Sequence, residues 1–247
     1  FFSLVFLSRI ALSEEKEKFK PKFSIKLTGG YGYVPLGDIN EFLDTRSGLS
    51  RKKKIYWPDL FSLRDEIKNI NYGLNLEGEL RINISSKFAI GIGIEYIHAK
   101  KESYLILRGK NSITTYTARE SYEPKITIIP IKLGIYYKLP LLPRTSLLFN
   151  IGGGYYFAKS SLFFDQHEKW SSFLSYDSAS YDSAYFSSFW TEHRYKFNGG
   201  NFGFHGGIGF EYSLGKNLSL VIEGQGRYVK IKELKGKDIM ITSWGDK

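Results

Sequence analysis

Hydrophobic and polar residues alternate with a period of two along most of the chain between residues 22 and 231. The pattern is clearest in Thr127–Phe157, where Lys132 lies between Ile131 and Leu133. Successive side chains of a β-strand point to opposite faces of the sheet. The alternation therefore predicts strands with one apolar, aromatic-ended face and one face of small and polar residues.

The connections between these segments alternate between long and short. Outer-membrane β-barrels have this arrangement, with short turns on the periplasmic side and longer loops outside. We therefore predict an all-β fold, a transmembrane antiparallel up-and-down β-barrel. Seven strands are expected, at Lys22–Tyr33, Ile70–Ile82, Phe88–His98, two within Thr127–Phe157 on either side of a turn at Leu139–Thr145, Asn201–Leu214 and Leu218–Ile231.

Bacterial single-chain barrels have an even number of strands. We therefore expect eight strands, with the last strand missing or truncated in this chain. Residues 1–20 begin with an apolar run and then become highly charged, which predicts the remnant of a signal peptide and an N-terminal extension. A short amphipathic helix is the alternative for this segment. Residues 21–247 are expected to form a single barrel domain with long extracellular loops at about 34–69, 99–124, 160–200 and 232–247, the first of which contains a short helix at Gly37–Asp44.

Two kinds of barrel fit alternating strands, and they differ in which face points inward. A soluble lipocalin-like barrel encloses its apolar residues, whereas a small membrane barrel exposes them and fills its lumen with the other face. The many glycines of the second face favour the membrane barrel. Buried charges need partners of opposite charge, so we expect an ion-pair network in the lumen, made by Glu77, Glu79, Arg81, Glu95, Lys132, His205, Glu211, Glu223 and Arg227.

The formal net charge of +10 suggests an anionic partner. The compact basic run Arg51, Lys52, Lys53, Lys54 is a candidate for binding a polyanion such as the phosphates of lipopolysaccharide, although it is equally well explained as a solvated loop. The sequence contains no recognisable nucleic-acid-binding motif, so we expect no nucleic-acid partner. It has no cysteine and no spaced set of metal ligands, so we expect no cofactor and no metal site.

Four stretches carry a family resemblance. They are Tyr31-Gly-Tyr, Gly37-Asp-Ile-Asn-Glu-Phe-Leu, Ile129-Pro-Ile-Lys-Leu-Gly-Ile-Tyr-Tyr and Gly152-Gly-Gly-Tyr-Tyr. Together they resemble the outer-membrane β-barrel domain family, which includes OmpA-, OmpX- and OmpW-like barrels. The resemblance covers about residues 22 to 231 and implies a location in the bacterial outer membrane. The aromatic-ended C-terminal strand that is usual in this family is absent from the sequence.

The leading functional hypothesis is a small non-enzymatic outer-membrane barrel, with a structural or surface-binding role or restricted, porin-like passage of small solutes. Its expected partners are outer-membrane lipids, including lipopolysaccharide, and an extracellular ligand, and we favour a monomer. The first alternative is a membrane-embedded hydrolase of lipid A or phospholipids. Such an enzyme would use a histidine, and His98 lies close in sequence to Glu102 and Ser103. The second alternative is a soluble lipocalin-like ligand-binding barrel.

Overall fold

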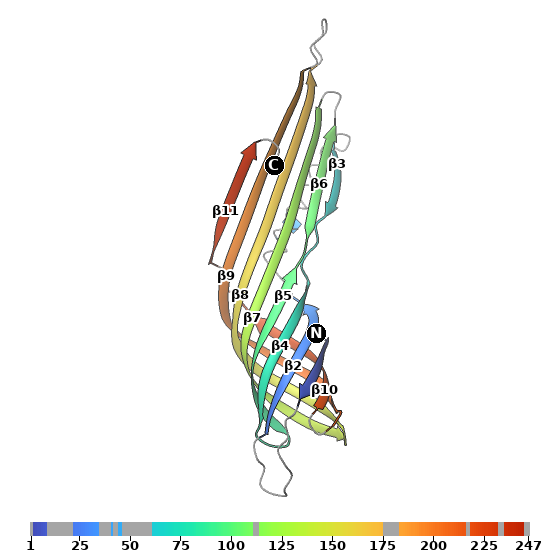
Figure 1. Ribbon diagram of the computed structural model, residues 1–247, viewed down its shortest axis with the longest axis vertical. Coiled ribbons are helices and arrows are strands. Elements are labelled where there is room, and N and C mark those ends of the chain that lie inside the picture. The colour runs from blue at the N-terminus through green and yellow to red at the C-terminus, as the bar shows by residue number, and fades with distance from the viewer. Residues whose placement is uncertain are drawn as a thin grey trace.

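The computed structural model consists almost entirely of antiparallel β-strands that form one strongly curled sheet (Figure 1). It describes residues 2–8, 22–34, 41, 44–45, 61–110, 114–174, 183–215, 218–231 and 235–244. The strands are β1 Phe2–Ser8, β2 Lys22–Tyr33, β3 Phe61–Glu66, β4 Tyr72–Asn83, β5 Phe88–Lys100, β6 Ser103–Lys110, β7 Thr114–Leu142, β8 Thr145–Leu174, β9 Ser183–Ser213, β10 Leu218–Val229 and β11 Lys235–Trp244.

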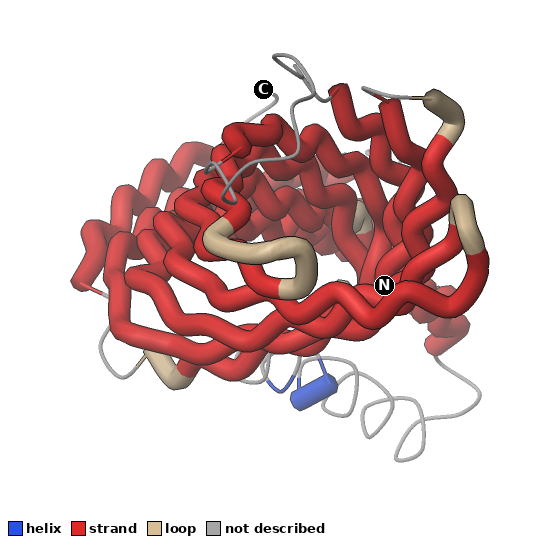
Figure 2. Tube along the Cα trace, turned by 90° about the horizontal axis from the view of Figure 1, so that it is seen from below, coloured by secondary structure: helices blue, strands red, loops and turns tan. Residues whose placement is uncertain are grey.

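The strands predicted from the alternation of apolar and polar residues pair with one another. β2 pairs with β4, β4 with β5, β5 with β7, β7 with β8, β8 with β9, and β9 with β10, and every pair is antiparallel. Seen along its length, this part of the sheet curls around a central axis (Figure 2). The prediction of an all-β antiparallel fold is therefore confirmed. No helix in the described part of the chain is long and apolar enough to span a membrane.

The N-terminal strand β1 lies between β10 and β2. Residues 3–8 pair with 223–218 of β10, and residues 2–8 pair with 31–25 of β2. This is the position for which the sequence analysis expected a missing or truncated last strand. Residues 2–8 of the segment interpreted from sequence as a signal-peptide remnant thus occupy a place in the sheet, and the described C-terminal residues 235–244 pair with β9 instead.

Strands β7, β8 and β9 are 29, 30 and 31 residues long, and they extend well beyond the curled end of the sheet (Figure 1). β6 and β3 continue this extension on the β7 side, and β11 continues it on the β9 side. We call the part built from β3, β6, β11 and the far halves of β7, β8 and β9 the sheet extension.

The sheet extension corrects the expectation that residues 160–200 and 232–247 are loops, because the described parts of these segments are largely strands, and within residues 99–124 it contains the hairpin of β6 and β7. The period-two pattern continues past Phe157, since Ser160, Leu162 and Phe164 are buried while the residues between them are only partly buried. The short turns lie at the opposite end, for example at Pro143 and Arg144. Within the predicted helix Gly37–Asp44, the described residues Glu41 and Asp44 are helical.

Candidate functional site: a charged lumen inside an apolar wall

The outward face of the curled part of the sheet is apolar and exposed. On β7, Ile131, Leu133 and Ile135 are 47%, 59% and 55% exposed, whereas Lys132 between them is 4% exposed. On β2, β4, β5, β8, β9 and β10 the apolar side chains are likewise exposed and the polar side chains between them buried. This arrangement is opposite to that of a soluble ligand-binding barrel, which encloses its apolar side chains.

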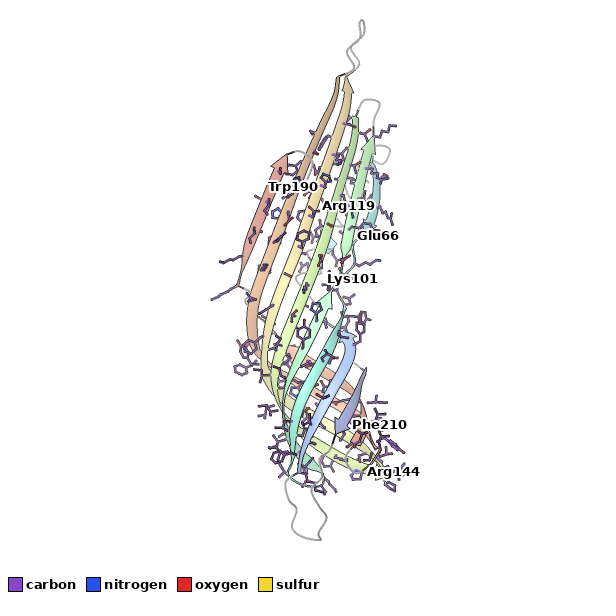
Figure 3. All side chains as sticks on the ribbon, in the orientation of Figure 1. Glu66, Lys101, Arg119, Arg144, Trp190 and Phe210 are labelled. Atoms are coloured by element: carbon purple, nitrogen blue, oxygen red, sulfur yellow. The ribbon has the colours of Figure 1, made fainter. Side chains whose placement is uncertain are left out.

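The apolar face has the height of a membrane. On β2 it runs from Phe23 to Tyr33, which is ten residue steps of about 3.4 Å, or roughly 26 Å across the membrane for a strand tilted by about 40°. Aromatic side chains border it at both ends, as they do in membrane barrels. At the extension end these are Tyr31, Tyr33, Tyr72, Tyr96, Phe157, Phe202 and Tyr228, and at the turn end they are Phe23, Phe88, Phe149, Phe210 and Tyr212. Figure 3 places Phe210 beside Arg144 at the turn end, with Trp190 and Arg119 far along the sheet extension.

The inward face carries the nine residues that the sequence analysis assigned to a lumen network. Eight of these are at most 9% exposed, and the side chain of the ninth, Arg227, is 8% exposed. They lie on β4, β5, β7, β9 and β10, which the pairing order brings around one axis. The side chains approach each other because the curl of the sheet turns all of these faces toward the same space.

One continuous network joins eight side chains across the lumen. The Nζ atom of Lys132 lies 2.8 Å from Glu77 Oε1 and 3.0 Å from Glu95 Oε2. Arg227 donates two hydrogen bonds to Glu95, of 3.1 and 2.5 Å, and a third of 2.6 Å to Gln225. Gln225 in turn donates to Glu223, which also accepts hydrogen bonds from Asn150 and from the fully buried Lys26. The network therefore crosses the lumen from β2 through β10, β5 and β7 to β4.

Two further ion pairs lie nearer the turn end. Arg81 donates two hydrogen bonds to Glu79 and lies 3.8 Å above the ring of Tyr136, so its guanidinium has both a carboxylate and an aromatic face as partners. Lys138 pairs with Glu211 at 2.6 Å. Among these groups five basic side chains, of Lys26, Arg81, Lys132, Lys138 and Arg227, are matched by five carboxylates, of Glu77, Glu79, Glu95, Glu211 and Glu223.

His205 is 4% exposed and packs beside two glycines. A Cβ atom built on Gly152 would lie 2.7 Å from His205 Cε1, and one built on Gly134 would lie 3.3 Å from His205 Nε2. These glycines provide the volume that the imidazole fills. The small residues of the lumen face are thus explained by close packing against large polar side chains from other strands.

Apolar layers lie on both sides of the charged network. Toward the sheet extension there is a cluster of Val34, Ile70, Ile97, Ala99, Ile126, Ile128, Tyr156 and Ala158. Toward the turns, Leu148 packs against Val221. Among the described residues, the main network therefore lies between the apolar cluster on the extension side and the Leu148–Val221 contact on the turn side, and the Lys138–Glu211 pair lies at the level of that contact.

Sequence reasoning missed Lys26 and Lys138 as members of these pairs. Lys26 lies on the polar face of β2 between Ile25 and Leu27, so the alternation that identified the other residues also pointed to it. The predicted polyanion-binding run Arg51, Lys52, Lys53, Lys54 lies outside the described residues.

His98 and Ser103, which lie close together in the sequence, form hydrogen bonds with other residues in the structure. The His98 ring is hydrogen-bonded to Thr127 at 3.1 Å on the outward side. Ser103 is 2% exposed and exchanges hydrogen bonds with the backbone of Lys68. Among the described residues, no three histidine, aspartate or glutamate side chains lie close enough together to hold a metal ion.

The chain matches a family model described as "Outer membrane protein beta-barrel domain" over residues 3–245. No curated protein and no solved structure matches the chain.

Proposed function

Because the chain belongs to the outer membrane protein β-barrel domain family and its location is therefore the bacterial outer membrane, we propose that its barrel is a closed anchor for a surface-exposed sheet. In this proposal eight strands form the barrel wall, and the order is β1, β2, β4, β5, β7, β8, β9 and β10. The sheet extension projects outside the cell and makes the contacts that give the protein its role. This role is non-enzymatic and is structural or surface-binding.

The observation that carries the proposal is the filled lumen. Five cations are matched with five carboxylates there, and the main network lies between an apolar cluster on the extension side and the Leu148–Val221 contact on the turn side. Barrels of about eight strands have an interior that side chains can fill. Opening a path for ions would require separating buried pairs, which costs several kcal/mol for each uncompensated charge.

Recording from planar bilayers tests the closed lumen. We expect purified, folded protein to give no large and stable conductance.

A second experiment tests the role of the sheet extension, and it uses the absence of cysteine from the native sequence. A cysteine introduced at Arg119 on the extension should react with a membrane-impermeant maleimide on intact cells, whereas one at Arg144 in the turn should react only after the cells are broken.

Restricted passage of small solutes is the second candidate function. It is supported by the family membership and by the polar character of the lumen face, which membrane barrels that conduct share. A large, stable single-channel conductance would favour this function over the closed anchor. Reaction of both introduced cysteines on intact cells would contradict the proposed orientation.

A further inference from the structure

A band of exposed lysines crosses the outward face of the sheet just beyond the aromatic border at the extension end. We call Lys100, Lys125, Lys159, Lys196, Lys235 and Lys237 the lysine band; they lie on β5, β7, β8, β9 and β11, and all are exposed. Figure 3 shows Lys101, the neighbour of the first of these, at the level where the curled part of the sheet gives way to the extension.

Strand register makes the band continuous. Lys100 lies directly opposite Lys125, and Lys196 lies directly opposite Lys237. Lys159 on β8 lies between these two pairs and is directly opposite Asn198 on β9. Lys235 on β11 is directly opposite the same asparagine. Residues that face each other in a sheet are neighbours on its surface, and diagonal positions are within reach of long side chains. The six ammonium groups therefore belong to one surface.

This arrangement costs stability unless anions lie on it. Like charges directly opposite each other destabilise a sheet, and the band contains two such pairs. Lys100 has acidic neighbours, Glu102 at 3.2 Å and Glu123 at 2.7 Å. In the part of the chain that the structure describes, the other five lysines form no ion pair within 4.0 Å.

The band begins at the height of the lipid headgroups. Lys159 follows the exposed Phe157 by two residues on β8, and Lys100 follows Tyr96 by four on β5, whereas Lys125 and Lys196 lie six residues beyond Ile131 on β7 and Phe202 on β9. These separations are about 7, 13 and 20 Å along the strand, and a tilt of about 40° reduces the last to roughly 16 Å of height. The headgroup layer is on the order of 5–8 Å thick on each side of the hydrocarbon core. A lysine side chain can reach back along its strand to that layer while its stem covers apolar surface.

We propose that the lysine band binds the phosphate groups of outer-leaflet lipids, specifically those of a phosphorylated glycolipid of the lipopolysaccharide type. The inference rests on the proposed function, because it requires the extension end of the barrel to lie in the outer leaflet. Ammonium groups suit this ligand because each acts as a point charge on phosphate. The band follows the curvature of the wall, so it presents its charges to several lipids at once.

The test compares lipid binding by native mass spectrometry of folded protein taken from mixed micelles. The micelles contain either bisphosphorylated lipid A or the same lipid with both phosphates removed, against a background of phosphatidylcholine. We expect the wild-type protein to retain the bisphosphorylated lipid preferentially. A triple variant Lys125→Gln, Lys159→Gln, Lys196→Gln should lose most of this preference, at roughly fivefold in affinity for each lysine removed.

A matched control removes the same charge from the same face further along the extension. Arg108→Gln, Lys110→Gln, Arg119→Gln changes three exposed cations beyond the band, and we expect it to retain the wild-type preference. A triple Lys→Arg variant at the three band positions should also retain binding. If the glutamine variant does not fold, each single Lys→Gln variant is measured in its place, with about a fivefold loss expected.

Several results would overturn the inference. They are equal retention of phosphorylated and dephosphorylated lipid, an equal loss in the control variant, and displacement of the lipid by millimolar inorganic phosphate. Stronger binding of a soluble polyanion such as heparin than of lipid A would also overturn it, since the band would then serve a soluble partner. The proposed function fails separately, if the folded protein does not insert or if its lumen conducts.

Discussion

Replacing Lys132 by methionine tests the energetic role of the lumen network. Lys132 is 4% exposed and neutralises Glu77 and Glu95 at 2.8 and 3.0 Å. Glu95 keeps Arg227 and Asn75 as partners in the variant. Among the described residues, the ion pair of Glu77 is with Lys132, so the substitution leaves the buried Glu77 carboxylate without an ion-pair partner within 4.0 Å.

Removing one partner of a buried ion pair costs about 3–5 kcal/mol of unfolding free energy. We expect Lys132→Met to destabilise the folded barrel by this amount. Adding Glu77→Gln removes the unpaired charge, so the double variant should regain about half of the loss. The corresponding coupling energy is on the order of 1.5–3 kcal/mol, within the range for residues in direct contact.

The assay is reversible urea unfolding from lipid vesicles, followed by tryptophan fluorescence and by the shift in gel migration between folded and heated protein. Lys110→Met is the matched control, because Lys110 is exposed on β6, and it should change stability by less than about 0.5 kcal/mol. The reasoning is refuted if Lys132→Met costs no more than the control. It is also refuted if the two lumen substitutions are additive.

Two further predictions concern the packing of the lumen and the lipid-facing wall. Gly152→Val should destabilise the fold by about 1–3 kcal/mol, because its Cβ atom would lie closest to the backbone oxygen of Leu133 and 2.7 Å from both His205 Cε1 and Gly134 Cα. Gly78→Val is the control, because its Cβ would meet only Leu27 at 3.8 Å. If urea unfolding shows equal losses of stability for the two valine variants, the lumen is loosely packed. Leu133→Arg introduces a charge near the middle of the apolar face and should cost about 2–4 kcal/mol in vesicles. A neutral effect of Leu133→Arg would mean that this face does not contact lipid.

The faces of the strands were predictable from the sequence because they depend only on the period of two. Lys132 between Ile131 and Leu133 points to the lumen wherever the strand lies in the sheet. The same rule identifies the other lumen residues without knowledge of their neighbours. Lys26 satisfies the rule as well, so its place in the network was available from the same pattern.

The pairing of charges was not predictable, because it depends on register and on the curl of the sheet. Glu95 and Arg227 are 132 residues apart in the chain, and their contact exists only because β5 and β10 face each other across the lumen. The assignment of Ser160–Leu174 to a loop failed for a different reason. Beyond the membrane, outward positions need not be apolar, so Lys159, Ser161 and Asp165 weaken the alternation although the strand continues.

The position of β1 was missed because its residues, Phe2–Ser8, form a nearly continuous apolar run. Such a run is typical of a targeting segment, and periodicity alone does not distinguish it from a short strand. Its place in the sheet depends on pairing with β10 and β2. The residues that pair between β1 and β10 are more than 200 positions apart in the sequence.

The closed lumen is tested most directly by the reactivity of a cysteine placed within it. Thr28 is 7% exposed and lies opposite Glu77 in the lumen, whereas Thr115 is exposed on the sheet extension. The native sequence contains no cysteine, so each of the variants Thr28→Cys and Thr115→Cys carries a single reactive thiol. In folded protein inserted in vesicles, we expect a water-soluble maleimide to label Thr115→Cys rapidly and Thr28→Cys only after unfolding in urea. Equal rates of labelling at the two positions in the folded protein would contradict a lumen filled by the ion-pair network.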